Sequence, residues 1–396
     1  MFGFGRAKRI YLDHASATSV LPAARDAVYR AMDTYANPGG IHADSVAAKR
    51  LLENSRERIA AHLGCKAREV IFTSGLTEAN NAGIVGTARA LERMRRGLSG
   101  THWIVSSIEH ASVLECFSEI ERMGGSVTYV DPEPSGIITA KRVADTLRPE
   151  TVCVSVGWGN NEIGTIQPLA EIARAIRDHE RKHTSTIIFH SDAGQAPLYR
   201  SPQVHTLGVD MLALGSGKLY GPRGIGVLHV GNRVQLAPVI FGGGQERGLR
   251  SGTEDPALAS GFAEALDIIT RERESECGRL RELRDNFARE IVARIPRAVI
   301  NGDMRHTLPH MLNISIPGEK SGEYLVLQLD HAGVALSTKS ACNEGERASH
   351  VVKALGESPP ASGWRAENTL RFSLGRRTTA RELSRVVEVL TQLIKA

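Results

Sequence analysis

One lysine stands in a setting that favours covalent chemistry. Lys218 follows the small residues Gly215-Ser216-Gly217, directly after the apolar run 211–214. A nucleotide-binding Walker loop does not fit, because Leu212 stands where a Gly is needed and Leu219 where Ser or Thr is needed. Two interpretations stay open: a surface lysine in a turn, or a lysine at a strand end that forms a Schiff base with a carbonyl compound.

A carboxylate upstream supports the second interpretation. Asp192 follows the apolar residues 186–189, at the expected carboxyl end of a strand, where parallel α/β sheets bind ligands. A pyridoxal phosphate site needs a Schiff-base lysine and a carboxylate beside the pyridinium nitrogen. Asp192 alone could equally be a helix cap. Together with Lys218 it indicates a pyridoxal phosphate site.

Two further segments could hold such a cofactor. Residues 73–78 join a strand to a helix start, where backbone amides and the Thr77 hydroxyl form an anion site. His110 follows the apolar run 103–105 and offers a ring that could stack on the cofactor. The competing interpretations are an ordinary helix cap for Thr77 and a structural role for His110.

The surrounding pattern alternates short apolar runs with longer amphipathic stretches, such as 77–96, 111–123 and 169–182. This alternation predicts an α/β fold, with a mainly parallel mixed sheet flanked by helices. A helical stretch over 255–294 leads to a smaller α+β unit. We expect a large cofactor-binding domain over residues 14–262 and a small domain formed by residues 1–13 and 263–396.

Composition restricts the class of protein. The 396 residues are 41% hydrophobic and 23% charged, which is ordinary globular usage. The net charge of +5 is not gathered in runs, so we expect no direct nucleic-acid or membrane partner. No secretory signal or membrane-spanning apolar stretch is evident. The five cysteines are widely spaced and form no CxxC pair, so we expect free thiols, no metal site and a cytoplasmic location.

Several segments together resemble a known family. They are residues 11–15 (YLDHA), 72–78 (FTSGLTE), 109–110 (EH), 160–164 (NNEIG), 192–195 (DAGQ), 218–222 (KLYGP), 242–253 (GGGQERGLRSGT), 340–342 (SAC) and 370–376 (LRFSLGR). In this order they resemble the cysteine desulfurases, which belong to the class V aminotransferase group of fold-type I pyridoxal phosphate enzymes. The resemblance covers nearly the whole chain.

The resemblance implies a pyridoxal phosphate cofactor and a role for each matching residue. Lys218 would form the Schiff base, and Asp192 would pair with the pyridine nitrogen. His110 would stack on the ring and assist proton transfer, while Asn161 and Gln195 would hydrogen-bond the ring oxygen. The phosphate would be held by Gly75, Leu76 and Thr77, by Ser216, and by Thr253 from the other subunit of a homodimer.

The resemblance also implies L-cysteine as the substrate. Arg371 would bind the substrate carboxylate through its planar guanidinium, with Asn37 and Asn161 nearby. Cys342 would take the sulfur as a persulfide and pass it to an acceptor protein, such as an iron–sulfur scaffold or a thiolation carrier. Lys339 would favour its thiolate. The other cysteines are expected to pack as small hydrophobes; they are Cys65, Cys116, Cys153 and Cys277.

The chain departs from the family pattern at the lysine turn. The family usually carries Ser-x-His-Lys, but Gly215 and Gly217 take the Ser and His places. Two side-chain contacts to the phosphate are therefore missing, and Ser216 with backbone amides would replace them. A selenocysteine lyase, another class V aminotransferase and a catalytically weakened homologue are the alternatives.

Overall fold

The computed structural model describes residues 9–95, 97–318, 320–339, 348–356 and 363–395. Within them the largest sheet has seven strands in the order β2-β8-β7-β6-β5-β3-β4, and β8 alone runs antiparallel to its neighbours. The predicted α/β class with a mainly parallel sheet is confirmed. The strands are β2 (Val70–Thr73), β3 (His102–Ser106), β4 (Ser126–Val130), β5 (Thr151–Ser155), β6 (Ile188–Asp192), β7 (Met211–Gly215) and β8 (Gly226–Val230).

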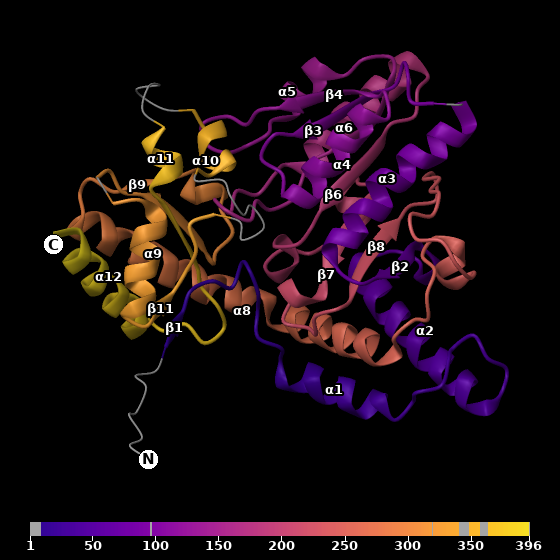
Figure 1. The fold of residues 1–396 in the computed structure, drawn as a ribbon, viewed down its shortest axis with the longest axis horizontal. Coiled ribbons are helices and arrows are strands. Elements are labelled where there is room, and N and C mark those ends of the chain that lie inside the picture. Colours follow the sequence, from indigo (N-terminus) through magenta and orange to yellow (C-terminus); the bar gives the residue numbers. More distant parts are fainter. Residues whose placement is uncertain (1–8, 96, 319, 340–347, 357–362, 396) are drawn as a thin grey trace.

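Helices cover both faces of this sheet, as Figure 1 shows. The central strands are apolar on both sides, which is typical of parallel strands that are buried between helices. In β3, Trp103 packs in the cluster with α3 and α4, whereas Ile104 packs in the main core with α2, α5 and α6. The helices are α2 (Ala43–Leu63), α3 (Leu76–Arg95), α4 (Ala111–Arg122), α5 (Ala140–Thr146), α6 (Leu169–His183) and α7 (Val204–Leu207).

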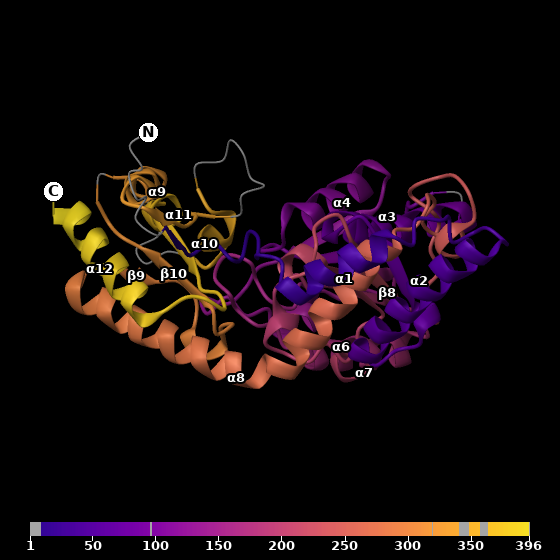
Figure 2. The same ribbon diagram turned by 90° about the horizontal axis from the view of Figure 1, so that it is seen from below.

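One helix joins the two parts of the molecule. The 39 residues of α8 (Pro256–Arg294) span about 58 Å. Asp255 caps it by accepting a hydrogen bond from the backbone N–H of Leu258, and Pro256 opens its first turn. Figure 2 shows α8 passing beneath both parts, where it packs against α1 (Pro22–Met32), α2 and α12 (Ala380–Lys395). The predicted boundary between residues 262 and 263 falls inside α8 and stays a prediction.

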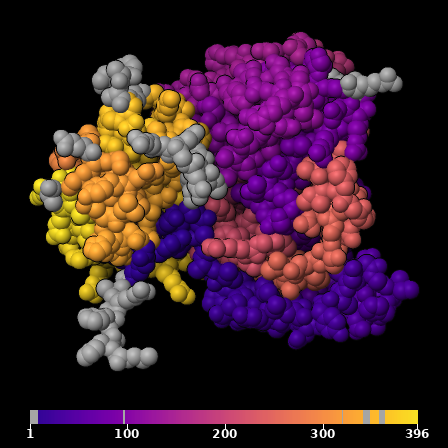
Figure 3. Space-filling view, in the orientation of Figure 1, coloured from indigo at the N-terminus to yellow at the C-terminus, as the bar shows by residue number. Residues whose placement is uncertain are grey.

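The residues from about 300 onward gather beside the large sheet, as the orange and yellow region of Figure 3 shows. They build an antiparallel sheet in the order β12-β10-β9. The N-terminal strand β1 (Ile10–Tyr11) pairs in parallel with β11 (Val334–Ala335). None of the described helices combines the length and apolar character needed to cross a bilayer. The remaining elements are β9 (Val299–Ile300), β10 (Met311–Ser315), β12 (Thr369–Ser373), α9 (Gly322–His331), α10 (His350–Ala354) and α11 (Trp364–Glu367).

Candidate active site

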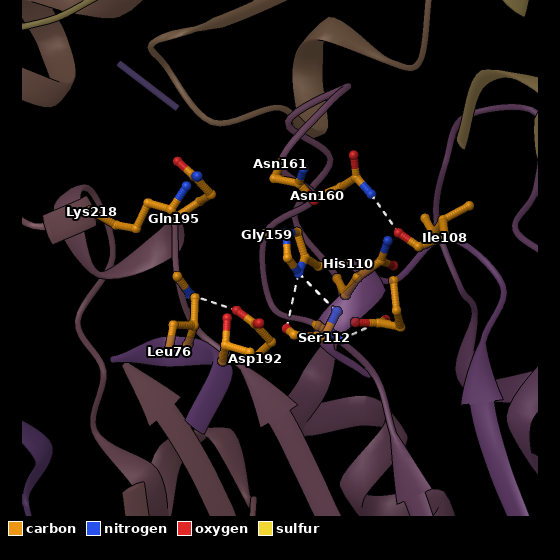
Figure 4. Close-up of a pocket in the computed structure, with 15 residues that line it drawn as sticks. Leu76, Ile108, His110, Ser112, Gly159, Asn160, Asn161, Asp192, Gln195 and Lys218 are labelled. Carbon is orange, nitrogen blue, oxygen red and sulfur yellow. Dashed lines mark hydrogen bonds between the residues drawn. The ribbon is translucent and has the colours of Figure 1, made fainter. Parts of the chain in front are cut away.

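A cavity opens at the carboxyl ends of β5, β6 and β7. The structure brings together there most of the side chains that the sequence singled out for the cofactor. Figure 4 shows Lys218 and Gln195 on one side, His110 on the other and Asp192 below them. The lining includes Leu76, Thr77, His110, Asn161, Asp192, Gln195 and Lys218.

Lys218 enters the site from a 3-10 turn that directly follows β7. Its Nζ donates hydrogen bonds to the carbonyl oxygens of Ala15 and Ser16, both at 2.8 Å. Thr18 Oγ1 holds the same turn by donating to the carbonyl oxygen of Gly217 at 3.0 Å. The N-terminal segment therefore fixes the amine at the edge of the cavity.

Asp192 is the last residue of β6, and both of its oxygens accept N–H groups. Oδ1 accepts from the backbone of Gly194 at 2.8 Å, and Oδ2 accepts from Asn80 Nδ2 at 2.7 Å. Hydrogen bonds from two donors favour the charged form of a carboxylate. The Asp192 carboxylate is therefore held in a fixed orientation at the cavity.

His110 is the N-cap of α4. Its Nδ1 accepts a hydrogen bond from the backbone N–H of Ser112 at 3.1 Å. A neutral imidazole that accepts at Nδ1 carries its proton on Nε2. Burial is the main cause that lowers the pKa of His110, the charge of Asp192 opposes this, and the charge of Lys218 lowers the pKa further. The ring is therefore neutral near pH 7.

The turn between β2 and α3 lies in close contact with the backbone of β8. Gly75 has a φ of 157°, within the range that favours glycine, and a Cβ on Gly226 of β8 would lie 2.6 Å from the carbonyl carbon of Gly75. Thr77 is exposed at the start of the 20-residue helix α3. The first N–H groups of such a helix have no partner within it, so they can bind an anion.

Asn160 and Asn161 have different tasks. Asn160 Oδ1 accepts from the backbone N–H groups of Glu162 and Ile163, both at 2.9 Å, and Nδ2 donates to Ile108 O at 2.9 Å. Asn160 therefore shapes the turn that presents Asn161 to the cavity. Gln195 Nε2 donates to the carbonyl oxygen of Ala15 at 2.8 Å, the same oxygen that Lys218 contacts.

Comparison with known proteins places this site in a family. Residues 10–386 match the family described as Aminotransferase class-V. The chain is 36% identical to cysteine desulfurase IscS of Dictyoglomus turgidum, over 98% of this chain and 95% of that one. The chain belongs to the cysteine desulfurase family. A solved NifS-like protein has a TM-score of 0.88 at 28% identity, covering 98% of this chain and 99% of the other.

A second solved structure is described as SspA in complex with cysteine. It has a TM-score of 0.76 at 31% identity, covering 92% of this chain and 98% of the other. The predicted membership of the cysteine desulfurase family is therefore confirmed by sequence and by fold.

The departures from the usual cysteine desulfurase turn have a local cause. A Cβ on Gly215 would lie 2.9 Å from Leu76 Cβ, and a Cβ on Gly217 would lie 3.2 Å from Arg223 Cγ. Leu76 therefore occupies the space into which a side chain at position 215 would start. Ser216 does not line the cavity: its Oγ is buried against Gly221, where a Cβ would lie 2.1 Å from it.

Arg371, predicted to bind the substrate carboxylate in this cysteine desulfurase, lies behind Asn161 and outside the cavity lining. Its Nη1 donates to Asn161 O at 2.9 Å, and its Nη2 donates to Asp13 Oδ1 at 2.8 Å and Ser16 Oγ at 2.6 Å. Its Nε is buried and has no hydrogen-bond partner among the described residues. Asn37 and Thr253 are exposed and also lie outside the lining, and their roles stay predictions.

Cys342 lies outside the described residues. Lys339, expected to favour its thiolate, has its Nζ 3.3 Å from Glu323 Oε1, so a carboxylate already balances this charge. On the other side of the undescribed segment, Ser349 Oγ donates to Glu162 Oε2 at 2.5 Å, and His350 Nε2 lies 3.0 Å from Glu109 O. These contacts tie α10 to the turns that shape the cavity.

Sequence reasoning missed several residues that support the site. Asn80 Nδ2 contacts both Asp192 and Ser112 Oγ, the latter at 2.9 Å, and so couples the carboxylate to the residue that holds His110. The sequence feature that could have identified Asn80 is its position: it is a polar residue one helical turn after Leu76, on the same face of α3. Glu109 is buried, and burial raises its pKa to about 8.

Proposed function

We propose that the chain is a pyridoxal phosphate-dependent cysteine desulfurase, which converts L-cysteine to L-alanine and takes the sulfur on Cys342. The observation that carries the proposal is the placement of Lys218 and Asp192 at one cavity, beside the ring of His110. A lysine and a carboxylate so placed meet the two requirements for holding the cofactor's aldehyde carbon and pyridine nitrogen. The family relationship supports the same reaction.

The residues present fit this cofactor. Asp192, held in a fixed orientation, would bind the protonated pyridine nitrogen, and the N–H groups at Gly75, Leu76 and Thr77 would bind the phosphate. When bound, pyridoxal phosphate supplies an electron sink for the substrate Cα. Gln195 and Asn161 would hydrogen-bond the ring oxygen, and Thr253 of a second subunit would add a phosphate contact.

The chain itself supplies the proton transfers. Lys218 Nζ, held by two carbonyl oxygens, is placed to move a proton at the substrate Cα. His110 is neutral and bears its proton on Nε2, so it can donate one proton and recover it. Asp192 keeps its orientation while this happens, because two N–H groups hold its oxygens.

The substrate carboxylate has a candidate partner in Arg371. Its buried Nε has no partner among the described residues, and a buried N–H without an acceptor is costly. A carboxylate that reached it would make a charge-assisted hydrogen bond. Cys342 would then accept the sulfur as a persulfide and deliver it to an acceptor protein in the cytoplasm.

The test is direct. The purified protein is incubated with L-cysteine, and alanine and sulfide are measured beside the Cys342→Ala and Lys218→Ala variants. We expect alanine from the parent protein, a fall of about 10³-fold for Lys218→Ala, and loss of persulfide for Cys342→Ala. Borohydride should bleach the yellow parent and leave its cofactor on Lys218.

Three outcomes would contradict the proposal. No alanine from a yellow parent protein would exclude the reaction. Unchanged sulfur release by Cys342→Ala would favour a selenocysteine lyase or an aminotransferase. A colourless protein that cannot be reconstituted with the cofactor would indicate a weakened homologue.

A further inference from the structure

A second group of reactive side chains lies at the other end of β2 from the cavity. Cys65, Glu69 and His229 each offer one ligand atom, and these atoms lie within 4.8 Å of one another. Glu69 immediately precedes β2, whereas the turn that lines the cavity follows it. This cluster is therefore separate from the catalytic machinery.

The fold fixes each member of the cluster independently. Helix α2 ends at Gly64, whose φ of 65° suits glycine, and the N–H of Cys65 donates to Ala60 O at 3.0 Å. Glu69 closes a 3-10 turn and its Oε2 accepts from the Lys66 N–H at 3.0 Å. His229 lies in β8, where it pairs with Val70, the residue after Glu69.

His229 has a buried ring nitrogen that is available to a ligand. The residue is only 3% exposed, and its Nδ1 is buried without a hydrogen-bond partner among the described residues. A buried ring nitrogen left unpaired costs free energy, which a ligand can recover. A neutral imidazole nitrogen is the commonest metal ligand in proteins.

The donor set favours a particular ion. A thiolate, an imidazole and a carboxylate are the ligands that Zn²⁺ takes in proteins, usually as a tetrahedron. Three atoms within 4.8 Å of one another lie at most about 2.8 Å from their centre, so shifts of about 0.5–0.8 Å reach zinc bonding distances. One negative sulfur and one negative carboxylate around a neutral ring would balance the charge of the ion.

We propose that Cys65, Glu69 and His229 bind one Zn²⁺ per chain, with a water molecule as the fourth ligand. Binding forms a zinc–sulfur bond and releases the thiol proton of Cys65 to solvent. Glu69 also lines an open groove of about 540 Å³, through which water and the ion can reach it. No zinc motif was evident from the sequence, because the three ligands come from separate segments and not from a CxxC pair.

The ion would have a structural role, because it would cross-link three segments of the chain. It would join the end of α2, the start of β2 and the end of β8, which otherwise meet through strand pairing and packing. Arg247 lines the same groove and interacts electrostatically with Glu69, so the ion would compete with this guanidinium for the carboxylate.

The experiment measures zinc in the purified holoenzyme. All proteins carry Cys342→Ser, so that this thiol cannot bind metal, and neither L-cysteine nor a chelating thiol is present. Each protein is equilibrated with ZnCl₂ and desalted, and its zinc content is measured by mass spectrometry. The variants are Cys65→Ser and His229→Ala, and the matched control is Cys277→Ser, which removes a partly exposed thiol outside the cluster.

We expect about one zinc per chain in the starting protein and in Cys277→Ser, and background levels in the two cluster variants. Substituting Co²⁺ in the starting protein should give a thiolate-to-cobalt charge-transfer band, a readout that does not depend on the folding of either cluster variant. No retained zinc, equal zinc in Cys65→Ser, or a cobalt spectrum without the thiolate band would each overturn the proposal. None of these readouts depends on desulfurase activity.

Discussion

Arg371 of β12 donates from Nη2 to Asp13 Oδ1 at 2.8 Å, across 358 positions in the sequence. The guanidinium side chain is 1% exposed and Asp13 is 21% exposed, so the ion pair is largely buried. The residue proposed to bind the substrate carboxylate is thus already held by a carboxylate of the chain.

This pairing leads to a prediction for Asp13→Ala. Removing the carboxylate leaves Arg371 without its main positioning contact, so we expect KM for L-cysteine to rise about 10-fold, while kcat changes little. Asp13→Asn keeps an oxygen acceptor, so its KM for L-cysteine should lie between those of the parent and the Asp13→Ala variant. An unchanged KM in a folded Asp13→Ala protein would show that this contact does not position Arg371 for substrate.

Asn80 should matter for cofactor binding although it lies behind Asp192. Asn80→Ala removes the N–H that Asp192 Oδ2 accepts, at a cost of about 1–3 kcal/mol, or roughly 5–150-fold in cofactor affinity. Titration of the apoenzyme with pyridoxal phosphate, followed by absorbance, measures the change. Asn81→Ala is the matched control, since Asn81 is the next residue and its side chain bonds only to Thr77 O among the described contacts. Equal losses of pyridoxal phosphate affinity in Asn80→Ala and Asn81→Ala would refute a specific role of Asn80.

Glu109 should make stability depend on pH. Its pKa of about 8 in the folded protein is raised above its ordinary value, mainly by burial and further by Asp192. Its contribution to stability is therefore complete below about pH 4.5 and is lost as the pH rises to about 8. Glu109→Gln removes this loss, so the variant should gain of the order of 2 kcal/mol on the parent between pH 5 and 8. Denaturant unfolding at pH 5 and at pH 8 measures the free energy of unfolding of both proteins. The same difference in this free energy at the two pH values would contradict the prediction.

Restoring the family's usual residue at position 215 should harm the enzyme. Gly215→Ser places a Cβ 2.9 Å from Leu76 Cβ and must displace the turn that is proposed to bind the phosphate. Gly217→Ser meets only the Cγ of the flexible Arg223 side chain, at 3.2 Å. We expect weaker cofactor binding for Gly215→Ser and near-parental binding for Gly217→Ser, measured as the dissociation constant of pyridoxal phosphate. Tighter binding by Gly215→Ser would contradict the steric account.

The sequence predicted the parts of the site that sit on regular elements. Asp192 ends an apolar strand and His110 and Lys218 follow one, and strand ends of a parallel sheet converge on one edge. The helical stretch over 255–294 was likewise evident, and it matches α8. The reversed direction of β8 was not predicted, because strand direction leaves no mark on composition.

The contacts that complete the site were beyond prediction from sequence. Lys218 is held by the backbone carbonyls of Ala15 and Ser16, and a carbonyl is the same in every residue. The helices α1 and α2 were missed as well, because α2 carries alanines and charged residues around much of its surface instead of a clear apolar stripe. The cluster at Cys65 depends on strand register between β2 and β8, which only the fold reveals.

The parallel pairing of β1 with β11 has a consequence for biosynthesis. Ribosomes add about 5–20 residues per second, so some 20–70 s separate the synthesis of Asp13 from that of Arg371. Until then, β1 and Asp13 lack the strand partner and the guanidinium that hold them. The segment that fixes Lys218 can therefore settle only after Arg371 has been made, so the catalytic cavity stays unfinished while the intervening residues are synthesised.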